Sequence, residues 1–218
     1  MLYGLLALIF WLPIPLGSHR PWTWGLMEVW VFSLTAGWLL LNLKEPRFER
    51  LRPYWPLLAI SGLFQLWIFI QQLPLPITLL QWIAPKTAAT YLAANPTLTS
   101  ATIYLDPNQT HVAFIKGVAY CCFLLLVQAL VTNTRRLKTL ALTVVLAGTF
   151  QAFYGVLLVL SGSETTWVMG FTNNGIATGG LRYKNHYSNY LVMCLCLGIG
   201  LLIASLGGSN GGKLKQRL

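Results

Sequence analysis

Long apolar runs separated by short polar segments dominate the pattern of this chain. A helix needs about 20 mostly apolar residues, within a range of roughly 17 to 25, to cross the hydrocarbon core of a bilayer. Six stretches approach or reach this length, and the first is the shortest: approximately residues 1–17, 24–43, 54–73, 110–131, 139–160 and 186–206. The pattern therefore predicts an all-α fold, a polytopic membrane helix bundle with about six transmembrane helices over residues 1–206.

Composition favours lipid rather than water as the solvent of this bundle. Of the 218 residues, 56% are hydrophobic and 9% are charged, against roughly 25% charged in an ordinary soluble domain. The N-terminal run has no basic segment before it and no A-x-A-like cleavage site, so we expect a retained helix rather than a signal peptide. The four cysteines lie in apolar stretches without C-x-x-C spacing or a histidine at ligand spacing. No metal site, disulfide framework or cofactor is therefore predicted.

The basic residues, which give a formal charge of +10, predict how the bundle is oriented. Cytoplasmic loops of membrane proteins carry an excess of Lys and Arg. One alternating set of polar segments holds ten of the fifteen basic residues, namely Lys44, Arg47, Arg50, Arg52, Arg135, Arg136, Lys138, Lys213, Lys215 and Arg217. We therefore expect both termini in the cytoplasm. The charge is assigned to topology, and no nucleic-acid partner is expected.

Two of the predicted external loops are long, and the first of these, residues 74–109, is longer than a simple connection requires. It contains an apolar cluster that includes Trp82 and ends before Pro85. This cluster predicts either a short interfacial helix on the outer leaflet or an irregular loop that contacts the bundle. The loop ends in Asp106-Pro107-Asn108-Gln109, which offers an N-cap, a Pro at the first helical position and a Gln at the third. The next helix is therefore expected to begin near Pro107.

The second long external loop, residues 161–184, is rich in Gly, Asn and Thr. Such a segment either brings backbone N–H groups close to a ligand or only turns the chain. After the last apolar stretch, residues 207–218 are glycine-rich and basic, which predicts a flexible cytoplasmic tail.

The strongest group of candidate binding residues stands at the external start of the last apolar stretch. Arg182 and Lys184 directly precede a predicted helix, whose N-terminus presents unpaired N–H groups and the positive end of the helix dipole. Asn185 is the expected N-cap, and His186 follows it. The arrangement favours an anion such as a phosphate or pyrophosphate. The alternative is that the two cations bind headgroups of outer-leaflet lipids.

Lys116 is a further candidate because it lies inside an apolar stretch, nine residues after Pro107. At 1.5 Å per residue this places it about 14 Å along the helix. An ammonium group near mid-membrane costs on the order of 2.5 to 3.5 kcal/mol on insertion scales. Lys116 is therefore expected to face the bundle interior or a polar cavity, with Glu28 as the candidate counter-ion, or else to extend toward the interface. No catalytic residue is assigned, since no paired carboxylate or Ser/His/Asp arrangement is evident.

Four local patterns occur in order along the chain. They are Arg20-Pro21-Trp22-Thr23-Trp24; Asp106-Pro107 with Thr110, Lys116 and Tyr120; Gln151-Ala152-Phe153-Tyr154-Gly155; and Gly180-Leu181-Arg182-Tyr183-Lys184-Asn185-His186-Tyr187, leading into Tyr190-Leu191. With this spacing, the chain resembles the O-antigen ligase and polysaccharide polymerase superfamily of bacterial inner-membrane glycosyltransferases. The last pattern departs from the common Asn-Arg-Asn-His form, because Tyr183 and Lys184 occupy its first two places.

The resemblance implies a multi-pass protein of the bacterial inner membrane that acts in the assembly of cell-surface polysaccharides such as lipopolysaccharide. It implies glycan transfer from an undecaprenyl-pyrophosphate carrier to an acceptor hydroxyl at the periplasmic face. Arg182, Lys184, Asn185, His186 and Lys116 would then bind the pyrophosphate. The expected partners are membrane lipid, the lipid-linked glycan and other polysaccharide-assembly proteins.

The resemblance covers only the N-terminal half of the superfamily's proteins. Their long periplasmic loop, with the histidine thought to act as a base, would follow residue 218, so the chain alone is expected to be incomplete for catalysis. Whether it is itself an enzyme stays open. The alternative function is a non-catalytic membrane scaffold or a lipid-binding partner in polysaccharide export. A small transporter would instead predict an inverted repeat and charged pairs at the midplane, and the sequence shows neither.

The charge distribution predicts the outcome of reporter fusions. Alkaline phosphatase, which is active only in the periplasm, should be inactive when fused after Lys44 or Lys138 and active when fused within residues 161–184, because the basic residues divide in that way. Matched fusions of a reporter that is active only in the cytoplasm should give the opposite pattern. Periplasmic activity after Lys44 or Lys138 would contradict this topology.

Overall fold

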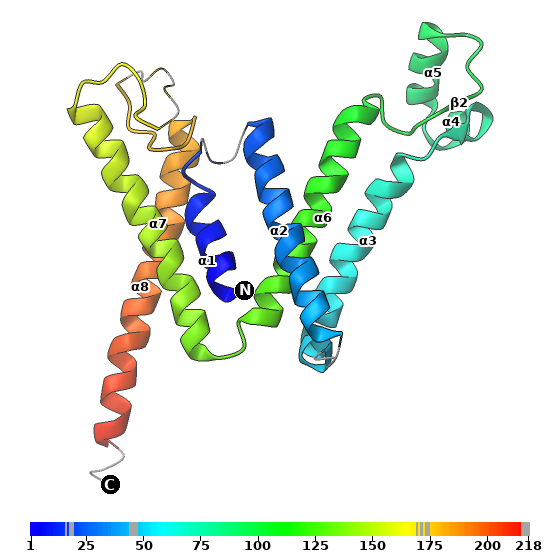
Figure 1. Cartoon of the computed structure of the whole chain (residues 1–218). Coiled ribbons are helices and arrows are strands. Elements are labelled where there is room, and N and C mark those ends of the chain that lie inside the picture. Colours follow the sequence, from blue (N-terminus) through cyan, green and yellow to red (C-terminus); the bar gives the residue numbers. More distant parts are fainter. Residues whose placement is uncertain are drawn as a thin grey trace. The chain divides into compact units, whose positions relative to one another are not determined.

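The computed structural model describes residues 1–15, 17, 20–43, 48–168, 170, 172 and 175–214, with the backbone alone at Phe48, Arg50 and residues 207–214. These residues are mostly helical (Figure 1). The elements are α1 (Leu2–Trp11), α2 (Pro21–Asn42), the 3-10 helix η2 (Phe48–Tyr54), α3 (Trp55–Gln71), β1 (Leu75–Pro76), α4 (Ile77–Ile83), α5 (Pro85–Ala94), β2 (Ser100–Ala101), α6 (Pro107–Leu130), α7 (Thr134–Leu160) and α8 (Lys184–Leu214).

Five helical segments are long and apolar enough to cross a bilayer, by length and composition. They are Pro21–Asn42, Leu51–Gln71, Pro107–Leu130, Thr134–Leu160 and Lys184–Leu206. Their apolar side chains are largely turned outward, and the most apolar window of 18 residues within Leu51–Gln71 contains no buried residue. Exposed apolar surface of this extent is rare in soluble monomers. The chain is therefore a helical membrane protein, as the pattern of apolar runs predicts, while the number of crossings and the side of each terminus stay predictions.

The first apolar stretch differs from its expected form. A continuous helix over residues 1–17 is wrong, because α1 ends at Trp11 after 10 residues. Such a helix is about 15 Å long, roughly half of the hydrocarbon thickness. Pro13 and Pro15 explain the early end, since proline lacks the N–H that the helix needs. The chain turns there, with the Ile14 N–H donating to the Trp11 carbonyl at 2.9 Å.

The described chain forms two compact units, Met1–Leu34 with Ala129–Leu218 and Thr35–Gln128. In the first unit, α1 packs against α7, and α7 packs against α8 (Figure 1). The Phe10 ring of α1 lies 5.8 Å from the Phe150 ring of α7, and Trp11 lies 6.3 Å from Trp30 of α2. The short helix α1 is therefore a packed part of this unit, where Leu5 and Leu8 are fully buried.

Small residues allow α7 and α8 to approach each other closely. A Cβ atom added at Gly148 would lie 2.5 Å from Cβ of Cys194, and one added at Gly155 would overlap the Tyr187 hydroxyl. The two glycines are seven residues apart on α7, and their partners Cys194 and Tyr187 are seven residues apart on α8 in the opposite chain direction. This is the pattern of an antiparallel seam. Close approach of this kind drives helix association in lipid, where apolar side chains gain little from leaving the solvent.

In the second unit, residues 75–101 form a small folded cluster rather than an irregular loop. Strands β1 and β2 pair in antiparallel register, with Leu75 opposite Ala101. The helices α4 and α5 cover a core of Leu80, Ala88 and Ala101. The short helix expected around Trp82 is confirmed, and the alternative of an irregular loop is wrong. Trp82 is 91% exposed, while its placement on the outer leaflet stays a prediction.

Two predicted helix boundaries have different outcomes. The start of α6 at Pro107 is confirmed, because the Asp106 carboxylate accepts a hydrogen bond from the Gln109 N–H at 3.0 Å. At the other end of the chain, the α8 backbone is helical through Leu214, over part of the segment for which the sequence predicts a flexible tail. The side chains of residues 207–214 and all of residues 215–218 lie outside the described part.

The α7–α8 seam predicts a specific stability change. Gly148→Ala should destabilise the protein by about 1 to 3 kcal/mol, because the added Cβ overlaps Cys194 and forces the helices apart. Gly200→Ala on α8 is the matched control, since nothing lies within 4 Å of its added Cβ. Unfolding of both variants in mild detergent, titrated with a denaturing detergent, measures the difference. Equal stability of the two variants would argue against the close seam.

Candidate functional site

The predicted binding residues gather where the chain enters α8. Arg182, Lys184, Asn185 and His186 are all exposed. The Arg182 guanidinium carbon lies 5.8 Å from the centre of the Tyr183 ring, and the His186 ring lies 5.6 Å from the same ring at an angle of 44°. Tyr183 therefore links the predicted cation and the predicted histidine. A cation–π contact at an exposed site is worth roughly 0.5 to 1 kcal/mol.

The helix begins two residues earlier than expected, and Asn185 is not its N-cap. Lys184 is the first residue of α8, and the Tyr187 N–H donates to the Tyr183 carbonyl at 3.0 Å. Tyr183 thus holds the cap position, and Asn185 lies in the first turn with its amide exposed. The physical reason is tertiary: Tyr187 is anchored on α7, as described next, and this anchor outweighs the preference of asparagine for the cap position.

A buried glutamine holds the chain just before these residues. Gln151 of α7 is 0% exposed, and its Oε1 atom accepts a hydrogen bond from the Gly180 N–H at 2.6 Å. Its backbone carbonyl accepts a second hydrogen bond, from the Tyr187 hydroxyl, at 3.1 Å. Within the described residues, Gln151 Nε2 is buried and has no hydrogen-bond partner. A buried amide that loses its partner costs about 1 to 3 kcal/mol, so this junction strongly favours one arrangement.

Two glycines make that junction possible. A Cβ atom at Gly180 would overlap the Ile14 carbonyl oxygen and lie 2.8 Å from that of Pro13. Gly179 has a φ angle of +55°, in the left-handed region that favours glycine, and a Cβ there would lie 2.6 Å from Gln151 Oε1. The close backbone approach expected of this glycine-rich segment is thus an approach to the turn after α1 and to α7.

The same face of α7 also holds the beginning of the external segment. The Tyr154 hydroxyl accepts a hydrogen bond from the Val168 N–H at 3.1 Å, and the Tyr154 ring meets the Trp167 ring edge-on at 6.0 Å. Gln151, Tyr154 and Gly155 are spaced i, i+3 and i+4, so they share one side of the helix. We call these three residues the loop-holding face. All three belong to the third sequence pattern, residues 151–155, but their spacing along the chain did not predict that they hold the loop.

The remaining predicted residue, Lys116, belongs to the second unit. It is half-buried on α6. The inward orientation of Lys116, its pairing with Glu28 and its part in the site stay predictions. His19 lies outside the described residues, whereas Pro21 begins α2 as the first pattern suggests, with the Thr23 hydroxyl donating to the Arg20 carbonyl at 2.7 Å.

The side chains of this site offer donors to an anion. Arg182 and Lys184 are basic residues with several N–H donors, and Asn185 adds an amide. In the part of the chain that the structure describes, no group of three or more His, Cys, Asp or Glu side chains is placed to hold a metal ion. No known protein-family model, curated protein or solved structure matches this chain. The resemblance to the O-antigen ligase superfamily therefore rests on the residue patterns alone.

The loop-holding face predicts the effect of a single substitution. Gln151→Leu should leave the buried Gly180 N–H without an acceptor, so amide hydrogen exchange at residues 175–183 should become roughly fivefold to a hundredfold faster, the range that corresponds to about 1 to 3 kcal/mol. Thr149→Val is the matched control on α7, because its hydroxyl bonds only to the Val145 carbonyl of its own helix. Unchanged exchange in Gln151→Leu would mean that Gln151 does not hold the loop.

Proposed function

We propose that this chain is the membrane part of an O-antigen ligase-like protein, which binds an undecaprenyl-pyrophosphate-linked glycan in the bacterial inner membrane. One observation carries the proposal: two of the four patterns behind the resemblance are in direct contact. Gln151 bonds to Gly180, and Gly155 receives Tyr187. Residues that serve one site are expected to meet in space, and these segments are separated in the sequence by the whole external loop.

The contacts place the two cations between two fixed points. Gly180, two residues before Arg182, is bonded to Gln151, and Tyr187, three residues after Lys184, is bonded to the Gln151 and Ala152 carbonyls. A short segment held at both ends loses little entropy when it binds a ligand. The cations are thus suited to receive a doubly charged group such as pyrophosphate at the membrane surface.

The substitution of Tyr183 for the usual asparagine has a consequence for this binding. Its ring lies close to both the Arg182 guanidinium and the His186 ring, so it contacts both side chains. Lys184 supplies the second charge from the first turn of α8, where the helix dipole also favours an anion. We assign these residues to binding, and we assign none of them to the transfer of the sugar.

A lipid-binding partner in polysaccharide export is the second candidate. Its supporting observation is the exposure of all four residues, Arg182, Lys184, Asn185 and His186. An exposed basic surface at an interface suits the headgroups of anionic lipids as well as a pyrophosphate. The two functions differ in whether the isoprenoid-linked pyrophosphate is preferred over ordinary anionic phospholipid.

A binding experiment separates them. The full chain in nanodiscs should bind an undecaprenyl-pyrophosphate sugar in preference to undecaprenol, even when the nanodiscs contain excess phosphatidylglycerol. Arg182→Ala and Lys184→Ala should each lower the affinity roughly tenfold to a hundredfold, as expected for charge-assisted hydrogen bonds of about 1.5 to 3 kcal/mol.

Lys86→Ala is the control, because Lys86 is an exposed cation of the predicted external loop 74–109. It should leave the affinity unchanged. Equal binding by wild type and by the Arg182→Ala/Lys184→Ala double variant would return these cations to the role of lipid-headgroup contacts. Loss of the preference when phosphatidylglycerol is added would favour the lipid-binding alternative.

A further inference from the structure

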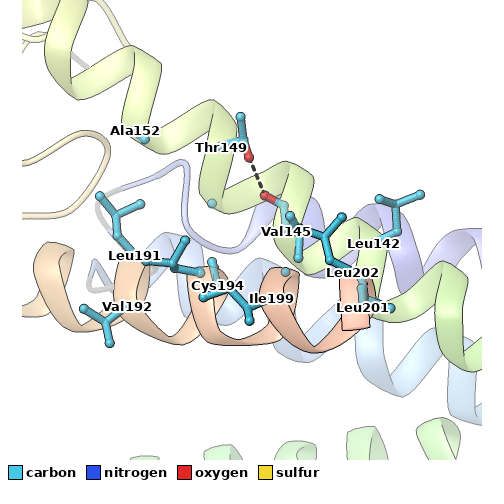
Figure 2. A pocket seen from close by; sticks show the side chains of 13 residues that line it. Leu142, Val145, Thr149, Ala152, Leu191, Val192, Cys194, Ile199, Leu201 and Leu202 are labelled. Atoms are coloured by element: carbon cyan, nitrogen blue, oxygen red, sulfur yellow. Dashed lines mark hydrogen bonds between the residues drawn. The ribbon is translucent and has the colours of Figure 1, made fainter. Parts of the chain in front are cut away.

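A groove of about 670 Å³ lies between α7 and α8 (Figure 2). It extends from Ala152 and Leu191 at one end to Leu142 and Leu202 at the other. Its lining is almost wholly apolar, and the Thr149 hydroxyl is already bonded to the Val145 carbonyl at 2.9 Å. A groove of this kind offers a hydrocarbon chain apolar contact along its length and offers a polar ligand little to bind.

The length of the groove corresponds to one leaflet of a bilayer. From Leu142 to Ala152 the helix rises about 15 Å at 1.5 Å per residue. The hydrocarbon core of a bilayer is about 30 Å thick, so one leaflet contributes about half of that. A single acyl chain that entered at the Leu142 end would therefore lie along the whole groove.

The Leu142 end of the groove adjoins a basic pocket. This second pocket, of about 440 Å³, is lined by Thr134, Arg135, Lys138, Thr139 and Leu142, so that Leu142 lines both pockets. Arg135, Lys138 and Leu142 are spaced i, i+3 and i+7, which places them on one side of α7. The lining of this side thus changes from cationic to apolar within two helical turns.

The third cation of this loop has another role. The Arg136 guanidinium donates to the Leu130 carbonyl at 2.8 Å and to the Thr132 hydroxyl at 3.2 Å, so it braces the connection before α7. At the opposite end of the groove, Tyr187 joins α8 to the Gln151 and Ala152 carbonyls. Among the residues that the structure describes, no cation lines the groove at that end. Charge complementarity therefore selects the Leu142 end for an anionic group.

We propose that α7 and α8 bind one anionic phospholipid, with its phosphate at Arg135 and Lys138 and one acyl chain in the groove. Arg135 and Lys138 belong to the segments that the basic-residue distribution assigns to the cytoplasm. That side of a bacterial membrane carries anionic headgroups, which attract basic residues near the surface. The site is separate from the residues before α8 and does not depend on the function proposed for them.

Binding of defined lipids to the purified full chain tests this site. In native mass spectrometry, dioleoyl-phosphatidylglycerol should bind at least tenfold more tightly than dioleoyl-phosphatidylcholine, which has the same chains. Arg135→Gln and Lys138→Gln should each lower the phosphatidylglycerol affinity about tenfold, as the loss of one charge-assisted hydrogen bond predicts. Soluble glycerol 3-phosphate should not displace the lipid, because it lacks the chain that occupies the groove.

Two controls separate the groove from general charge attraction. Arg136→Gln removes an equal charge from the same loop and should change the affinity less than twofold, because Arg136 does not line the pocket. Gly198→Leu should fill the groove and weaken phosphatidylglycerol without altering charge. Its Cβ has room, with Val145 Cγ1 at 3.6 Å, and Thr149→Phe is a second filling variant at an exposed position.

Several results would overturn the proposal. Equal losses in Arg135→Gln, Lys138→Gln and Arg136→Gln would indicate only diffuse electrostatic attraction. Equal affinity for the two phospholipids would remove the role of the cations, and unchanged binding in both groove-filling variants would remove the role of the groove. Self-association of the chain that Gly198→Leu abolishes, with lipid affinity unchanged, would show instead that a second copy covers the groove.

Discussion

The hydrogen bond from the Gly180 N–H to Gln151 Oε1 is the interaction on which the arrangement of the first unit depends. In a membrane protein a backbone N–H removed from water needs an internal partner, and leaving it unpaired is costly. A buried glutamine side chain supplies that partner in the middle of a membrane helix. Because Gly180 also lies against the carbonyls of Pro13 and Ile14, one bond fixes the end of α1, the external loop and the start of α8 together.

The second constraint is the short distance between α7 and α8, which glycine permits. Gly148 and Gly155 bring α8 close enough for Cys194 and Tyr187 to contact α7 directly. The Tyr187 hydroxyl of α8 can then reach the Gln151 and Ala152 carbonyls of α7. These bonds between the helices form because the axes of α7 and α8 are close. Close packing and polar pairing therefore support each other along this seam.

The sequence predicted the features that depend on nearby residues. The long apolar helices follow from run length, and the start of α6 follows from Asp106 and Pro107, which act within one turn. Pro13 and Pro15 also indicate an early end of α1. The prediction of a helix over residues 1–17 followed the length of the apolar run instead. The cap of α8 and the role of Gln151 were not predictable in this way. Both depend on contacts between residues 29 to 36 positions apart, which local patterns do not encode.

The two cation pairs of the first unit follow from one geometric fact. Helix α7 has 27 residues and is therefore about 40 Å long, which matches the thickness of a bilayer with its headgroup regions. Because α8 packs antiparallel to α7, Arg135 and Lys138 lie at one end of the helix pair and Arg182 and Lys184 at the other. In a bilayer that α7 crosses, each pair would be at the level of the phosphates of one leaflet. Cations at both ends resist movement of the helix pair along the bilayer normal. In that bilayer the same charges would also set the depth of the buried Gln151 junction.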